Sequence, residues 1–365
     1  MRRFFIPVFV LFLLTAFGPA TCQADATASV NASLTVEQAI DLALANRNDV
    51  RSASLDLDAA SVSNDLAWDY ASGVMEATQI PGTNQYVSVG SDPFLAVYNS
   101  DFALKAKQKA YDIKRQSVEF SVYQRYYAVV NALDKFDAQQ LAGQQAAENL
   151  KIAALRNQLG MDTNLALYKA ESQATAAQGS LATAQQELDQ KYIALLEYIG
   201  MPKTSRPALV RELTFVAVDI ADPEAKFSAI VNDSPSVWIA KQSVQLTEET
   251  AGNANSDELD AINLEKADIN VLTTRESMLQ ATRNIYYGLK SIEDSYPTAQ
   301  ASVRTTQEAL RVAKLMLDLG MGTKTDVLNA EIAANNATQM LDSLSYQHAI
   351  LKMAFEKPWA YGSAN

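Results

Sequence analysis

The side chains that could do chemistry are few in this chain, and their spacing argues against a catalytic or metal site. His348 is the single histidine and Cys22 the single cysteine. His348 has no second histidine or nearby cysteine with which to build a metal site, and no Ser-His-Asp arrangement is credible around it. The acidic run from Glu248 to Asp260 lacks the spacing and the glycine of an EF-hand. We therefore expect no catalytic residues, no cofactor and no metal.

The remaining chemistry-bearing patterns point the same way. The glycines are scattered and form neither a P-loop nor a dinucleotide fingerprint. Carboxylates occur throughout, but nothing in the sequence marks two of them as a buried acid/base pair. The formal net charge is −12, which argues against nucleic acid or an anionic membrane surface as a partner because both attract basic patches. We interpret the chain as a non-enzyme with a solvated acidic surface, and His348 as a packed or surface residue.

The first 26 residues have the composition of a secretory signal. Arg2 and Arg3 precede an uncharged apolar run, Phe4 to Phe17, which is short for a membrane-spanning helix. Small residues follow, and Ala24-Asp25-Ala26 resembles a signal-peptidase site. We interpret residues 1–26 as a signal peptide that is removed on export. The alternative is that the apolar run stays as a membrane anchor.

Cys22 lies before this cleavage site, so the mature chain would have no thiol, disulfide or cysteine-based metal site. A lipoprotein cleaved just before Cys22 is a second alternative. The preceding Pro19-Ala20-Thr21 matches a lipoprotein signal poorly, and we therefore favour simple cleavage.

The chain contains an internal duplication at a constant separation of 160 positions. Residues 150–155 (LKIAAL) match residues 310–315 (LRVAKL), and the likeness continues without a gap on both sides. The other matched pairs are Tyr126-Tyr127 with Tyr286-Tyr287, Leu159-Gly160-Met161 with Leu319-Gly320-Met321, Thr163 with Thr323, and Ala170-Glu171 with Ala330-Glu331. A single offset held over so long a stretch indicates two tandem repeats.

The two halves also begin alike, at a different separation. Residues 34–50 resemble residues 229–237 when Val50 is matched to Val237, an offset of 187. The first half is therefore the longer one between these valines and the tyrosine pairs, and we place its excess in residues 71–98. The expected organisation is a first helical repeat at 33–205 and a second at 222–357.

Apolar residues at helical spacing predict long helices in both halves. In the first half they are Val118, Val122, Tyr126, Val129, Leu133 and Phe136, and in the second Met278, Ile285, Leu289, Ile292 and Tyr296. Steps of three, four and seven place each set on one stripe of a helix, as in a coiled coil. Residues 101–158 contain no proline and one glycine, so this helix would be about 85 Å long. The predicted fold is all-α and rod-like.

Each long helix ends in a short reversal followed by an alanine-rich helix, over residues 165–200 or 325–357. Glycine suits the C-terminal end of a helix, and threonine suits the N-cap of the next. We therefore predict two antiparallel coiled-coil hairpins whose tips form the partner-binding end of the rod. The tip residues are Gly160, Met161 and Thr163 in the first repeat, and Gly320, Met321 and Thr323 in the second.

From Leu34 to about Met353 the chain resembles the TolC family of outer-membrane efflux proteins. The resemblance is carried by L-T-x-E-x-A-I-x-x-A-L-x-N from Leu34, by the duplicated long helix, and by the repeated G-x-x-T-x-x-x-[LV] tip. It implies a homotrimeric helical conduit across the periplasm whose tips meet a periplasmic adaptor protein linked to an inner-membrane transporter. It also implies export to the outer membrane, the periplasm or the cell envelope.

Carried over by position, the second tip would narrow the entrance of such a conduit. Asp326 matches an acidic position of the family, and Asn329 stands at the next acidic position. Leu317 replaces a tyrosine of the family's polar network, and Gly322 replaces an arginine. The chain therefore lacks most of that network. The competing interpretation of Asp326 is an acidic residue favoured by the helix dipole in a first turn.

The family's four strands per protomer, which close a transmembrane barrel, are not evident here. At most a short β-hairpin is expected near residues 74–98, and residues 247–270 resemble a polar helix reversal. Two functions are therefore open. The chain is either a conduit subunit for efflux or secretion, or an exported coiled-coil scaffold of TolC ancestry that lacks a barrel and forms no pore. Membrane contact is undecided between these alternatives.

Overall fold

The computed structural model describes residues 33–75, 93–211, 213–251 and 256–362. The expected signal peptide, with Cys22, lies outside this part of the chain. So does most of the expected β-hairpin near 74–98, although its outermost positions, 74–75 and 93–98, are helical rather than extended. The helices are α1 (Val36–Asn46), α2 (Asn48–Met75), α3 (Pro93–Gln158), α4 (Asn164–Ile199), α5 (Pro223–Asp233), α6 (Pro235–Glu249), α7 (Asp257–Asp318), α8 (Lys324–Glu356) and α9 (Pro358–Gly362).

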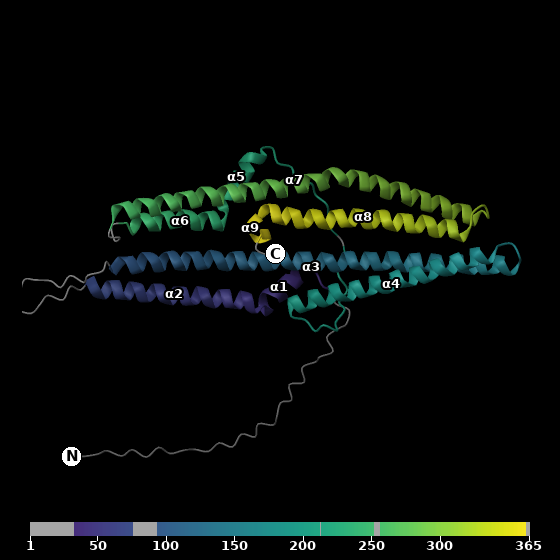
Figure 1. Cartoon of the computed structure of the whole chain (residues 1–365), viewed down its shortest axis with the longest axis horizontal. Helices are drawn as coiled ribbons and strands as arrows, with labels where there is room; N and C mark the ends of the chain where they lie inside the picture. The colour runs from purple at the N-terminus through teal and green to yellow at the C-terminus, as the bar shows by residue number, and fades with distance from the viewer. Residues whose placement is uncertain (1–32, 76–92, 212, 252–255, 363–365) are drawn as a thin grey trace, which may run out of the picture.

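Two long helices set the length of the rod (Figure 1). Helix α3 has 66 residues and α7 has 62, so they are about 99 and 93 Å long at ~1.5 Å per residue. Helices α2 and α4 lie end to end along α3, and α6 and α8 lie end to end along α7 (Figure 1). The two resulting layers pack side by side through α3, which contacts both α6 and α8. The prediction of long antiparallel helical hairpins in two repeats is confirmed.

The helix bounds follow the two sequence offsets. Helices α1 and α5 have 11 residues each and lie 187 positions apart, and α6 begins 187 positions after α2. Helices α3 and α7 end 160 positions apart, and so do the starts of α4 and α8. Val50 and Val237, the third residues of α2 and α6, are both buried. The repeat is therefore structural as well as sequential.

The length difference between the halves is not confined to residues 71–98, as the sequence suggested. Helix α2 has 28 residues and its repeat equivalent α6 has 15, so about half of the excess is added helix. Residues 247–251 and 256–270 form the end of α6, a turn and the start of α7. This matches the expected helix reversal, apart from residues 252–255, which the structure does not describe.

The core is concentrated at the middle of the rod, where α1, α5 and α9 pack against the long helices. One cluster surrounds Tyr126 and Tyr127 of α3, and the other surrounds Phe227 of α5 and Tyr286 of α7. The segment between α4 and α5 crosses this region from the first layer to the second (Figure 1). We call this region the waist. Tyr127 stacks on Tyr346 of α8 at 5.1 Å between ring centres, which joins the two repeats.

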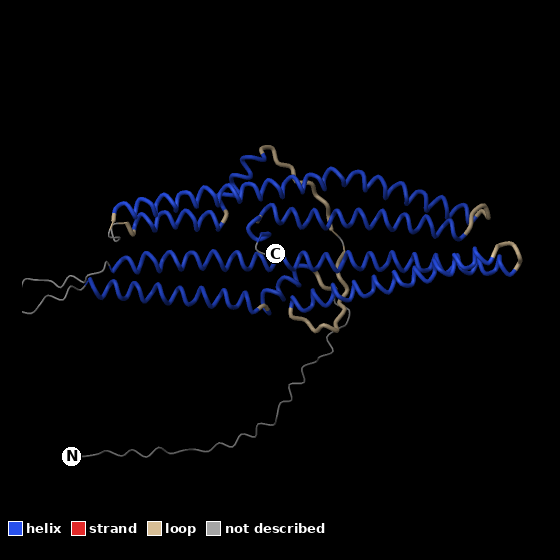
Figure 2. The backbone as a smooth tube through the Cα atoms, in the orientation of Figure 1, coloured by secondary structure: helices blue, strands red, loops and turns tan. Residues whose placement is uncertain are grey.

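Helices and loops make up the described part of the chain (Figure 2). Its single β pairing is an isolated parallel bridge between Leu34 and Leu209. None of the described helices is both long enough and apolar enough to cross a lipid bilayer.

Candidate functional site at the hairpin tips

The first tip reverses the chain through a glycine in the left-handed region. Gly160 has a φ of 66°, and the amide of Met161 donates to the carbonyl of Arg156 at 2.8 Å. Thr163 then caps α4, because its hydroxyl accepts from the amide of Ala166 at 3.3 Å. These bonds satisfy groups that the helix ends leave without partners. Gly160 and Thr163 therefore form the reversal and the N-cap that follows it, and their part in binding a partner stays a prediction.

The second tip repeats the reversal. Gly320 has a φ of 71°, and the amide of Met321 donates to the carbonyl of Met316 at 2.8 Å. Thr323 and Asp326 form a capping box at the start of α8: the amide of Asp326 donates to the Thr323 hydroxyl, and the Asp326 carboxylate accepts from the Thr323 amide at 2.9 Å. Hydrogen bonds from Thr323 lower the pKa of Asp326. Asp326 is therefore a helix-capping residue, and its role in a pore stays a prediction.

The two tips differ in how they are braced. In the first, the Asn157 amide group donates to the carbonyl of Asp162 at 3.2 Å and to the Asn164 side chain at 3.0 Å. The second tip has Leu317 and Gly322 at the positions of Asn157 and Asp162, so this polar brace is absent there. A Cβ at Gly322 would lie 3.2 Å from the backbone nitrogen of Leu317. The second tip is closed by tight backbone packing instead.

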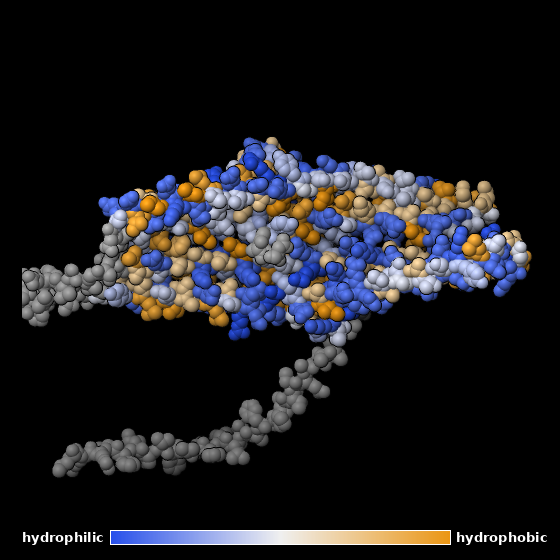
Figure 3. Space-filling view, in the orientation of Figure 1, coloured by the Kyte–Doolittle hydropathy of each residue, from blue (hydrophilic) through white to orange (hydrophobic). Residues whose placement is uncertain are grey.

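Both tips present apolar side chains to solvent. Met161 is 67% exposed and Met321 is 74% exposed, and Leu159 and Leu319 beside them are also exposed. Hydrophobic residues lie at this end of the rod, on the right of the molecule in Figure 3. Apolar groups at the end of a rod are available for contact with another protein.

Two polar contacts join the hairpins close to the tips. Lys324 Nζ of α8 lies 3.6 Å from Glu148 Oε1 of α3, and the Gln145 side chain of α3 donates to the side-chain oxygen of Asn329. The sequence singled out Asn329 but not its partner, and it missed Glu148 and Lys324. Repeat matching aligns equivalent positions and says nothing about which positions of the two hairpins meet.

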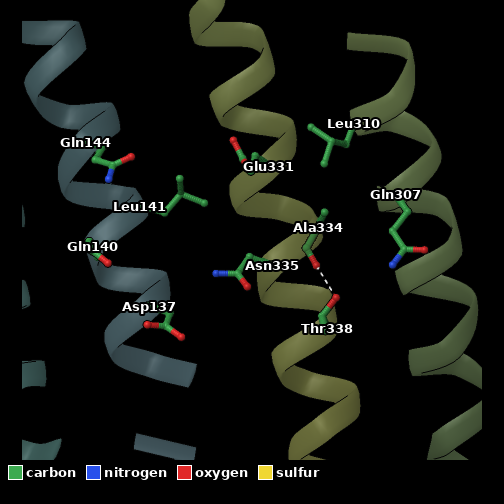
Figure 4. A pocket seen from close by; sticks show the side chains of 10 residues that line it. All are labelled: Asp137, Gln140, Leu141, Gln144, Gln307, Leu310, Glu331, Ala334, Asn335 and Thr338. Atoms are coloured by element: carbon green, nitrogen blue, oxygen red, sulfur yellow. Dashed lines mark hydrogen bonds between the residues drawn. The ribbon is translucent and has the colours of Figure 1, made fainter. Parts of the chain in front are cut away.

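Behind these contacts a groove of about 430 Å³ separates the hairpins. Figure 4 shows its lining side chains, among them Asp137 and Gln144 of α3, Asn335 of α8 and Leu310 of α7. A neighbouring groove shares Asp137 and Asn335 and adds carboxylates whose pKa values are raised by burial, those of Asp134 and Asp342. The hairpins are thus held by an aromatic core at the waist and by polar contacts toward the tips.

The histidine that was considered for a metal site lies away from the tips. His348 is buried at the waist, where its Nε2 lies 3.0 Å from Glu293 Oε1. No group of three or more histidine, cysteine or carboxylate side chains within the described residues is arranged to hold a metal ion.

Solved structures with this arrangement of helices include several outer-membrane channels. The CmeC outer membrane channel of Campylobacter jejuni is 17% identical, with a TM-score of 0.65 over 90% of this chain and 86% of that one. The outer membrane protein VceC of Vibrio cholerae is 14% identical, with a TM-score of 0.60 over 88% of this chain and 94% of that one. The open-state MtrE outer membrane channel of Neisseria gonorrhoeae is 15% identical, with a TM-score of 0.54 over 89% and 88%.

The chain has the fold of the TolC-like outer-membrane channels. No protein-family model matches the chain and no curated protein matches it in sequence, so the TolC-like fold is recognised through the arrangement of the helices. The structures matched here are of channels rather than enzymes, which agrees with the prediction of a non-enzyme.

The TolC-like tips should depend on the glycines with positive φ. Replacing Gly320 with valine is expected to lower the free energy of unfolding by at least about 1 kcal/mol, because a β-branched residue disfavours the left-handed region. A Cβ at this position meets no atom within 4 Å, so the effect is conformational rather than steric. Chemical denaturation measures it.

A matched control is Gly143→Ala inside α3, where the added Cβ also meets no atom within 4 Å. There the change is expected to stabilise, because alanine favours a helix by about 1 kcal/mol over glycine. Equal effects of the two substitutions would contradict the role assigned to Gly320.

Proposed function

We propose that this chain is a subunit of a periplasm-spanning helical conduit for efflux or secretion. The observation that carries the proposal is the match of the whole helical rod, over about 90% of the chain, to structures described as outer membrane channels. The conduit would be a homotrimer located in the outer membrane and periplasm after export. Passage of a substrate through such a conduit requires no catalytic residue. The contacts described above at the waist and the tips hold the helices together.

The partner-binding end would be the tips, with Gly160, Met161 and Thr163 in one and Gly320, Met321 and Thr323 in the other. Support comes from the exposed methionines and leucines there and from the rigid, capped reversals that display them. The partners would be a periplasmic adaptor protein and, through it, an inner-membrane transporter. Asp326 and Asn329, near the second tip, would lie at the narrowing of the conduit.

A second candidate is an exported helical scaffold with the same fold that forms no pore. It would share the helical rod and the tips with the conduit and would differ from it in passing no current. Planar-bilayer recording of the purified mature protein separates the two functions. Stable single-channel currents are expected for a conduit, and their absence from a correctly assembled oligomer would favour the scaffold.

The contacts between the hairpins offer a sharper test of the conduit. In Lys324→Glu a second carboxylate would lie beside Glu148, where the lysine now lies 3.6 Å away. The two negative charges should repel each other, so the tips of the two hairpins should separate and the single-channel conductance should rise. Lys151→Glu is the matched control, because Lys151 also lies near Glu148, at 3.5 Å, but on the same helix. An equal rise in both variants would show that the change acts through net charge and not through the inter-hairpin contact.

A further inference from the structure

The two repeats differ at one ion pair of the waist. In the second repeat, Glu224 at the start of α5 accepts two hydrogen bonds from Arg283 of α7, of 2.6 Å and 3.2 Å. In the first repeat the equivalent of Glu224 is Glu37, 187 positions earlier, and the equivalent of Arg283 is Tyr123, 160 positions earlier. Glu37 forms no ion pair with any described residue. The first repeat therefore keeps the carboxylate and lacks the guanidinium.

A pocket of about 470 Å³ lies beside this carboxylate, between α1, α3, α8 and the segment that joins α4 to α5. Its walls include Tyr123 and Tyr127 of α3, whose ring centres are 6.1 Å apart. Ile40 of α1 and Ala349 of α8 add apolar surface. Aromatic and apolar walls with a few polar groups are typical of small-molecule sites of this size.

Two buried polar side chains line the same pocket. Only 4% of the His348 side chain and 5% of Tyr127 are exposed. His348 Nε2 lies 3.0 Å from Glu293 Oε1; since a carboxylate only accepts hydrogen bonds, Nε2 carries the hydrogen and the neutral ring keeps a lone pair on Nδ1.

Neither His348 Nδ1 nor the Tyr127 hydroxyl has a hydrogen-bond partner among the described residues. Both atoms can still be reached from outside, because the enclosed side-chain atoms without a partner in this part of the chain are Asp134 Oδ2 and Ser234 Oγ. Polar groups this deep are nearly always paired. A molecule that enters the pocket can supply the missing partner.

The charges around the pocket favour a cation. Three carboxylates and two lysines line it: Glu37, Glu119, Glu356, Lys352 and Lys357. Burial and the negative charges of Glu37 and Glu119 raise the pKa of Tyr123. Burial is also the main reason why the pKa of Tyr127 is raised, and Glu37 adds to it. The negative charge of Glu37 is thus felt at both hydroxyls.

We propose that this pocket binds a small aromatic amidine or guanidine that carries a hydrogen-bond donor at its far end. The planar cation pairs with Glu37 through two parallel hydrogen bonds, as Arg283 does with Glu224. The aromatic body lies against Tyr123 and Tyr127, where tyrosine rings also attract a cation. The far donor pairs with His348 Nδ1 and the Tyr127 hydroxyl. The site is formed within one copy and is independent of the proposed conduit.

Three ligands of one shape test this chemistry by isothermal titration calorimetry on the mature protein. The probe 4-aminobenzamidine has both the cation and the far N–H donor, and it should bind at one saturable site. Benzamidine lacks the far donor and should bind about tenfold more weakly, the effect of one hydrogen bond. The neutral 4-aminobenzamide lacks the cation and should show no saturable binding.

Variants locate the site. Glu37→Gln should weaken binding of 4-aminobenzamidine at least about tenfold, and Glu224→Gln is the matched control that should leave it unchanged. Tyr123→Arg rebuilds the ion pair of the second repeat, so its guanidinium should occupy Glu37 and abolish binding. Tyr127→Phe removes one hydroxyl from the deep end and should weaken binding, whereas Tyr287→Phe at the equivalent exposed position should not.

Helical circular dichroism of each variant should match that of the wild type, which separates loss of the site from loss of the fold. Three results would overturn the proposal. The first is no saturable binding of 4-aminobenzamidine to the wild type. The second is equal weakening by Glu37→Gln and Glu224→Gln, and the third is equal affinity for 4-aminobenzamide and 4-aminobenzamidine.

Discussion

Replacing Glu293 with alanine is expected to lower the free energy of unfolding by about 2–3 kcal/mol, because one buried carboxylate holds three separate segments. Its Oε1 accepts from the amide of Val218 at 2.7 Å and lies 3.0 Å from His348 Nε2. Its Oε2 accepts from Lys290 Nζ at 2.7 Å, and Lys290 also donates to the carbonyl of Val218 at 2.5 Å. The segment between α4 and α5 is thereby tied to both α7 and α8.

Most of this loss of unfolding free energy should come from the polar groups that Glu293→Ala leaves without a partner. His348 is buried, so its ring nitrogen and the Val218 amide would lose their partner in a region that water reaches poorly. Lys290 is more exposed and can turn toward solvent. Glu293→Gln keeps one acceptor oxygen for Val218 but removes the charge and replaces the oxygen that accepts from Lys290 with an NH2 group, so it should still cost less than alanine.

The dependence on pH follows from the same contacts. Burial disfavours the charged carboxylate, but the hydrogen bonds from Lys290, Val218 and His348 outweigh it and lower the pKa of Glu293. A lowered pKa in the folded state means that the stabilisation is present above the unfolded-state value of about 4.3 and is lost as pH falls. The difference between wild type and Glu293→Ala should therefore shrink in acid.

Chemical denaturation at one fixed protein concentration measures both effects, since assembly also contributes to apparent stability. Glu308→Ala is the control, because Glu308 and Arg311 form an ion pair of the same spacing on the same helix but are exposed. It should leave the denaturation midpoint unchanged. A Glu293→Ala midpoint equal to that of Glu308→Ala would contradict the role of Glu293 at the waist.

Local signals in the sequence were sufficient for the helices and the tips. The glycine and threonine positions fixed both reversals because left-handed φ and N-cap bonds involve residues close in sequence. The repeat offset carried this result from one half to the other. The start of α3 was placed too late, near residue 101 rather than at Pro93, because the periodic stripe begins well inside the helix.

The contacts between segments far apart in sequence were not predictable in the same way. Lys290 and Glu293 are a local pair on α7, but no local pattern records that Glu293 also meets His348 of α8 and Val218 of the segment between α4 and α5. His348 was interpreted as packed or on the surface, and only the fold showed it to be packed. For Asp326 the sequence left a capping and a pore role open. The capping box shows the first, whereas the second depends on neighbouring copies.

Tyr126→Phe is the second substitution with a large expected effect, about 2 kcal/mol of unfolding free energy, because it removes one oxygen atom that serves three backbone groups. The Tyr126 hydroxyl donates to the carbonyl of Leu34 at 2.8 Å, lies 3.1 Å from the carbonyl of Val210, and accepts from the amide of Val210 at 2.9 Å. It thereby joins the start of the first repeat to the segment that leads to the second.

Phenylalanine keeps the ring in its buried place and leaves these backbone groups short of a partner, so the effect isolates the hydroxyl. The matched control is Tyr127→Phe, since Tyr127 is the adjacent buried tyrosine and contributes its ring to the stack on Tyr346. Denaturation should separate the two variants, and hydrogen exchange should show faster exchange of the Val210 amide in Tyr126→Phe alone. If Tyr127→Phe were equally destabilising, the waist would depend on tyrosine packing in general. In that case the hydrogen bonds of the Tyr126 hydroxyl, which fasten the crossing segment to the start of the first repeat, would contribute no more than the ring packing does.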